Sequence, residues 1–239
     1  MNPIRVIAKK ELDSFFDSLI AYILIVAFLG FSGFFTWMYG NGDVFFRRQA
    51  DLQAFFSVAY WTLFIFIPAL TMRQLAEEKK SGTIELLLTK AVTIRQIVLG
   101  KFFACLMLVL IALVLTLPYY YTVSQIGNID HAATILGYVG LILMSGAYIS
   151  IGLLASSITN NQIVAFLLAL LIGIFFHILV GMMSAGVTGG LSELLNTLSM
   201  RRHFESIMRG VVDSKDLIYF GSIIFIGIML SEVAISNRK

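Results

Sequence analysis

The sequence predicts an all-α integral membrane protein with six transmembrane helices. Hydrophobic residues make up 59% of the 239 positions and charged residues only 13%, and the mean hydropathy is +0.90, which is outside the usual range of soluble domains. A membrane-spanning helix needs about 20 mainly apolar residues. Six stretches meet that requirement: residues 19–39, 54–72, 102–121, 132–154, 163–181 and 217–235. They lack the short alternating pattern of barrel strands, so we expect one transmembrane domain over residues 1–239.

The distribution of Lys and Arg predicts how the chain is oriented in the membrane. If the N-terminus lies inside, six of the 17 basic residues fall in outer segments: Arg47, Arg48, Arg201, Arg202, Arg209 and Lys215. The other eleven then fall in inner segments, and Lys and Arg near span ends favour the cytoplasmic side. We therefore expect both termini in the cytoplasm. The stretch before the first span is amphipathic and carries both signs of charge, unlike a cleavable signal.

Residues 1–18 are expected to form an amphipathic helix at the membrane interface. Asn2 followed by Pro3 is typical of a helix N-cap with proline at the first helical position. An apolar stripe follows at helical spacing: Ile4, Ala8, Leu12, Phe15 and Leu19. Such a helix would lie along the membrane surface before the first span; the alternative is a solvated extension of that span.

Within the spans, proline and small residues predict breaks and close contacts. Pro68 and Pro118 each sit late in a span, where we expect them to kink or end the helix. The fourth span carries Gly146, Ser150, Gly152 and Ser156, small residues that allow helices to approach closely. We favour packing over substrate contact as their role.

Residues 73–101 form the charged connection between the second and third spans. Residues 73–80 are predicted to extend the second span as a helix, Ser81 and Gly82 to break it, and residues 83–88 to form a second short helix. Thr93 and Gln96 have the spacing of a capping box for the next helix. Two short helices joined by a glycine break would form a lever that moves the second and third spans together. An ordinary solvated connector is the alternative.

The longest outer segment, residues 182–216, is predicted to contain two short amphipathic helices broken near Ser199 and Met200. A stripe of leucines at helical spacing precedes that point, and a second apolar stripe follows it. The two stripes are out of phase with each other, so one continuous helix does not fit both. The expected polar face of the second helix carries Arg201, Arg202, His203, Glu205 and Arg209, and its apolar stripe begins at Phe204. We expect both helices to re-enter the outer membrane interface.

Several kinds of chemistry lack the residues they need in this sequence. No Gly-x4-Gly-Lys-Ser/Thr loop for nucleotide phosphates occurs. His131, His177 and His203 fall in different segments, without Cys or carboxylate partners at metal-ligand spacing. We interpret His177 as a hydrogen-bonded packing residue and Cys105 as a small buried one. Energy, if it is used, must therefore come from another chain.

Several segments of the sequence resemble the ABC-2 type permeases of ATP-binding-cassette transporters, and more narrowly those of gliding-motility systems. They are residues 64–73 (FIFIPALTMR), residues 82–101, residues 161–166 (NQIVAF) and residues 203–213 (HFESIMRGVVD). The charged connection described above carries the most specific likeness. One departure is Ala91, where the family usually has proline.

This resemblance implies a permease subunit in a bacterial inner membrane. Its partners would be a cytoplasmic ABC ATPase, which binds the ATP and Mg, a second permease subunit with an extracytoplasmic domain or a second copy of this chain, and membrane lipid; no cofactor or nucleic acid is expected in this chain. The implied ATPase-coupling residues are Glu78, Lys79, Gly82, Thr83, Ile84, Glu85, Leu86, Ser156, Asn160 and Asn161. Arg201, Arg202, His203, Phe204, Glu205 and Arg209 belong to the implied extracytoplasmic helices.

Two other classes of function stay open from the sequence. A structural membrane anchor would bind the same partners without moving a substrate, and only ATP turnover that depends on this chain separates it from a permease. A secondary transporter needs ionisable groups within the membrane, and only Glu232 and His177 are available.

Overall fold

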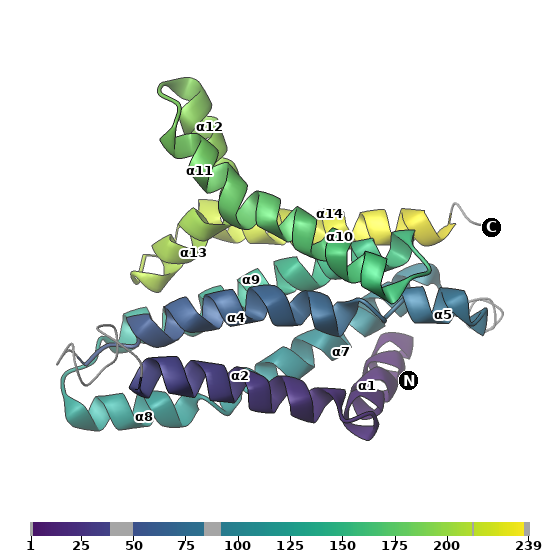
Figure 1. Cartoon of the computed structure of the whole chain (residues 1–239), viewed down its shortest axis with the longest axis horizontal. Coiled ribbons are helices and arrows are strands. Elements are labelled where there is room, and N and C mark those ends of the chain that lie inside the picture. Colours follow the sequence, from purple (N-terminus) through teal and green to yellow (C-terminus); the bar gives the residue numbers. More distant parts are fainter. Residues whose placement is uncertain (1, 39–49, 84–91, 212, 237–239) are drawn as a thin grey trace.

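The computed structural model describes residues 2–38, 50–83, 92–211 and 213–236 (Figure 1). Within those ranges all regular structure is helical, and six helical segments are long and apolar enough to cross a membrane. They are Ile20–Trp37, Gln53–Lys80, Ile94–Ile126, His131–Ile158, Gln162–Ala185 and Ser214–Ser236. The predicted fold class is confirmed.

The individual helices subdivide several of these segments. In chain order they are α1 (Pro3–Asp17), α2 (Ile20–Trp37), α4 (Gln53–Thr71), α5 (Ala76–Lys80), α7 (Ile94–Val114), α8 (Leu117–Ile126), α9 (His131–Ile158), α10 (Gln162–Ile174), the π-helix η1 (Phe175–Leu179), α11 (Val180–Ala185), α12 (Gly190–Leu198), α13 (Met200–Met208) and α14 (Ser214–Ser236).

The N-terminal helix begins as predicted and packs on α7. The Asn2 side chain accepts a hydrogen bond from the Ile4 backbone at 3.1 Å, with proline in the first turn. Gly100 of α7 permits a close approach: a Cβ there would lie 2.6 Å from Cγ2 of Ile7. Leu19 then adopts the left-handed conformation, with φ 60°, and the chain turns from α1 into α2.

Helix α9 is the centre of the structure. In its apolar stretch 78% of the residues are buried, compared with 22% in α2 and α14. The small residues on α9 lie where other helices come close. A Cβ on Gly152 would lie 1.9 Å from Oγ1 of Thr71 in α4, and one on Gly227 of α14 would lie 2.6 Å from Oγ of Ser150. The expected packing role is confirmed at these positions.

Two of the breaks between helices lie close to the prolines in the sequence, and others do not. Helix α4 ends three residues after Pro68, and Pro118 lies in the first turn of α8 after α7 has ended. Residues 73–80 do extend the second span, but not as one continuous helix, because turns occupy residues 72–75 and α5 begins only at Ala76. Helix α7 begins at Ile94 with the predicted capping box of Thr93 and Gln96, so the helix starts before the apolar run expected to span the membrane from residue 102.

Figure 1 shows which segments share an end of the bundle. Helices α1 and α5, the turn between α9 and α10 and the last residues of α14 lie at one end. The starts of α9 and α14 lie at the other end, near α13. Helix α10 packs on α9 and α4, and the chain then continues through η1 and α11 to α12, which projects from the bundle (Figure 1).

Candidate functional site

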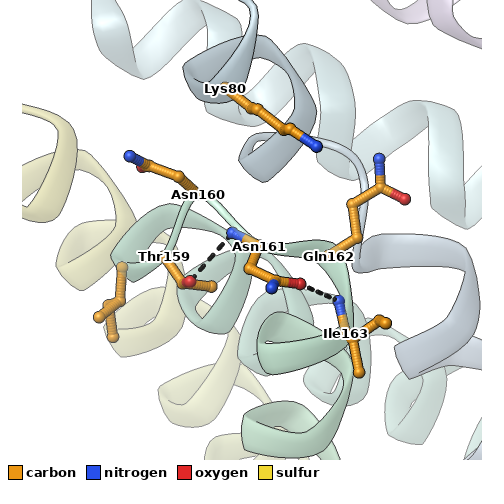
Figure 2. A pocket seen from close by; sticks show the side chains of 7 residues that line it. Lys80, Thr159, Asn160, Asn161, Gln162 and Ile163 are labelled. Atoms are coloured by element: carbon orange, nitrogen blue, oxygen red, sulfur yellow. Dashed lines mark hydrogen bonds between the residues drawn. The ribbon is translucent and has the colours of Figure 1, made fainter.

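An open groove lies between α5 and the turn that joins α9 to α10. Its volume is about 760 Å³, and it is lined by Lys80 and residues 158–163. Figure 2 shows Lys80 on one side and the turn on the other. The turn is held by its own polar groups: the Asn161 backbone donates to Thr159 Oγ1 at 3.1 Å, and Asn161 Oδ1 accepts from the Ile163 backbone at 2.9 Å. Asn160 and Asn161 therefore belong to this groove, as part of the predicted coupling set.

Ser156 of α9 holds α5 in position next to this groove. Its Oγ accepts hydrogen bonds from the backbone of Leu75 and Ala76, both at 3.0 Å, and donates to the carbonyl of Met72 at 3.0 Å. These bonds satisfy backbone groups at the turn and at the start of α5. Ser156 is fully buried, so it supports the α5 segment and does not itself form an exposed contact surface.

Lys79 makes a second link between α5 and α9. Its Nζ donates a hydrogen bond to the backbone carbonyl of Ser157. The structure thus brings together two parts of the predicted coupling set that are about 80 residues apart in the chain.

Glu78 points inward, toward a buried lysine that sequence reasoning missed. Lys101 of α7 is only 1% exposed, and its Nζ lies 2.7 Å from Glu78 Oε1 and 3.2 Å from Glu11 Oε1 of α1. A lysine this deeply buried is stable when it is paired and hydrogen-bonded. The capping box at Thr93 places Lys101 two turns into a helix, but its burial depends on Glu78 and Glu11 from two other helices.

The remaining coupling residues lie at or beyond the edge of the described structure. Gly82 has φ +72°, a conformation that favours glycine, so the predicted break is present. Thr83 Oγ1 lies 2.9 Å from Ser81 Oγ. Ile84, Glu85 and Leu86 lie outside the described residues, as does most of the predicted helix over residues 83–88.

At the opposite end, α12 and α13 are separated at Ser199, as predicted. Arg201 pairs with Glu205 at 2.6 Å, and this hydrogen bond raises the pKa of the Arg201 guanidinium. Arg209 donates to the backbone carbonyl of Glu205 at 3.1 Å. Arg202 is exposed on the same helix.

The assignment of His203 to the polar face is wrong. The side chain is buried, with Nδ1 2.6 Å from Asp216 Oδ1 of α14 and Nε2 2.9 Å from the carbonyl of Thr197. Tyr219 stacks on the His203 ring, with ring centroids 4.0 Å apart. His203 therefore joins α13 to α14, because it lies on the buried stripe with Met200, one turn earlier.

Phe204 and His177 take part in one aromatic cluster. Phe204 stacks on Tyr60 at 4.9 Å, and His177 lies between Tyr60 and Phe64, at 4.1 and 4.4 Å. His177 also hydrogen-bonds to Tyr148. Both side chains are buried, which agrees with a packing role for His177. Across the described ranges, no group of three His, Cys, Asp or Glu side chains is arranged to hold a metal ion.

Comparison with known proteins gives one family. A family model described as an ABC-2 family transporter protein matches residues 41–200, a range that includes α5, the groove and α12. No curated protein matches the chain.

Proposed function

Because the chain belongs to the ABC-2 transporter family, whose permeases work with a separate ATPase, we propose that the groove lined by Lys80 and residues 158–163 is the contact for that ATPase. The membrane subunit carries no nucleotide-binding loop of its own. ATP and Mg would accordingly be bound by the partner, and this chain would respond to the movement of the partner.

The hydrogen bonds that hold α5 are the observation that supports this proposal. Ser156 joins α5 to α9, and Lys79 joins it to the carbonyl of Ser157. Through Glu78 the same short helix reaches Lys101 of α7 and, from there, Glu11 of α1. A partner that displaces α5 would thus act on α4, α7, α9 and α1 together, since packed elements move as units.

The finer assignment follows the resemblance of the sequence. We assign the chain to the gliding-motility type of permease, with the α5 end of the bundle and both termini in the cytoplasm of a bacterial cell. Helices α2, α10 and α14 are largely exposed and apolar, so lipid and a second permease subunit, or a second copy of this chain, would cover them.

Charge reversal in the groove tests the ATPase contact. The chain is co-expressed with a candidate ABC ATPase from the same organism, and ATPase retention and ATP turnover are measured in nanodiscs. Lys80→Glu should lose the ATPase, because a mismatched charge in a partly buried interface costs about 2 to 5 kcal/mol of binding. Arg95→Glu is the matched control, because Arg95 is exposed at the same end of the molecule but outside the groove.

The two variants and the turnover measurement separate the possible outcomes. Equal retention for Lys80→Glu and wild type would place the contact elsewhere. If the ATPase binds but its turnover is the same with and without this chain, the chain is a structural anchor. Glu85→Lys applies the same charge reversal to the predicted helix outside the described residues, and we expect it too to lose the ATPase.

A further inference from the structure

A second open pocket lies at the other end of the molecule, where α14 begins. Its volume is about 680 Å³, and α12, α13 and α14 all contribute to it. It is lined by Gly189, Ser192, Glu193, Asn196, Thr197, Arg202, His203, Lys215, Asp216, Ile218 and Tyr219. None of these residues belongs to the ATPase contact proposed at the α5 end.

Apart from His203 and Asp216, which pair with each other, the charged residues that line this pocket have no ion-pair partner among the residues that the structure describes. Arg201, on the same helix, is neutralised by Glu205, but Arg202, Lys215 and Glu193 form no ion pair with any side chain that the structure describes. Two cations and one carboxylate thus face the pocket without partners.

Asp216 adds an unused acceptor. The residue is only 5% exposed, and Oδ1 is bound by His203. Its other oxygen, Oδ2, is buried and has no hydrogen-bond partner in the described part of the chain. A buried carboxylate oxygen without a donor is costly, so a ligand that brings an N–H donor would be stabilised here.

The pocket also has an apolar border. Ile218 of α14, which lines it, is 69% exposed. Since α14 is long and apolar enough to cross a membrane, its first turn lies at the level of lipid headgroups. A ligand bound here would have its polar end at the charges and its apolar end against Ile218 of α14.

We propose that this pocket binds the headgroup of a zwitterionic phospholipid that carries a primary amine, such as phosphatidylethanolamine. Arg202 and Lys215 would hold the phosphate, because cationic side chains form strong charge-assisted hydrogen bonds with phosphate. The ammonium group would donate to Glu193 and lie beside the Asp216 carboxylate. A choline headgroup has no N–H donor for these oxygens, and a glycerol headgroup has no cation.

Lipid binding to the whole delipidated chain tests this directly. Native mass spectrometry would compare phosphatidylethanolamine, phosphatidylcholine and phosphatidylglycerol with identical acyl chains. We expect the ethanolamine lipid to bind about tenfold more tightly than the choline lipid, the ratio that one charge-assisted hydrogen bond provides. Glycerophosphoethanolamine without acyl chains should compete weakly, because it lacks the apolar part.

Three single substitutions assign the residues. Arg202→Gln should weaken binding of all phosphate-containing lipids, whereas Glu193→Gln should reduce the preference for ethanolamine over glycerol headgroups. Arg209→Gln is the matched control, because Arg209 caps the end of the same helix but lies outside the pocket and bonds to the Glu205 carbonyl.

Several outcomes would overturn the proposal. Equal affinity for ethanolamine and choline lipids would do so, as would equal losses in Arg202→Gln and Arg209→Gln. Tighter binding of the glycerol lipid that Glu193→Gln does not change would mean a general cationic surface. If acyl-free glycerophosphoethanolamine binds as tightly as the lipid, the pocket serves a soluble ligand. Loss of a second permease subunit in Arg202→Gln, with unchanged lipid binding, would mean a protein contact.

Discussion

Lys101 is the residue at which three separate parts of the chain meet. Its ammonium group lies between Glu11 of α1 and Glu78 of α5, and it is itself almost completely buried. Three charges in such a place depend on one another, because removal of one leaves the others desolvated and unpaired. The exposed pair of Arg73 and Glu77 is 3.0 Å apart, but a surface pair of this kind contributes little.

Replacement of Lys101 by methionine should therefore destabilise the protein strongly. We expect a loss of about 3 kcal/mol, because two partly buried carboxylates lose their cation. Thermal unfolding in detergent would show it as a lower midpoint. Arg73→Met is the control and should change stability by no more than about 1 kcal/mol. Glu78→Gln combined with Lys101→Met should recover part of the loss; an additive result would mean that the two residues do not interact.

At the scale of helices, the sequence predicts starts better than ends. Asn2 and the Thr93 and Gln96 capping box mark two starts directly, since they are local hydrogen bonds between near neighbours. The turn at residues 72–75 could not be predicted in this way, because it depends on Ser156, about 80 residues away. The burial of His203 likewise depends on Asp216 and Tyr219 of another helix.

The contact between α4 and α9 leads to a prediction about Gly152. Gly152→Ala should destabilise the protein by about 1 to 3 kcal/mol, the usual range for overpacking, because the added Cβ would lie 1.9 Å from Oγ1 of the buried Thr71. Gly30→Ala in α2 is the control, since nothing lies within 4 Å of its added Cβ. That variant should be neutral or slightly more stable, because alanine favours helix. Similar unfolding midpoints for the two variants would contradict the close contact.

For the molecule as a whole, the apolar runs are sufficient to predict six spans, because their length and composition are local properties. The meeting of residues 78–83 with residues 156–161 at one end of the bundle also follows from the alternation of spans. The groove between them, the buried triad at Lys101 and the pocket between α12, α13 and α14 could not be predicted, because each is formed by side chains from several helices.

The arrangement of the two ends predicts how the protein lies across a membrane. Cysteines introduced at Ser81, beside α5, and at Ser192, in α12, should react with an impermeant thiol reagent from opposite sides of sealed vesicles. The native Cys105 is fully buried and should give no background. The greater number of Lys and Arg residues on the α5 side predicts that Ser81→Cys reacts only from the cytoplasmic side. Three spans separate Ser81 from Ser192, which places the two residues on opposite sides. Labelling of both cysteines from one side would mean that an even number of spans separates them. The groove and the pocket between α12, α13 and α14 would then share one face of the membrane.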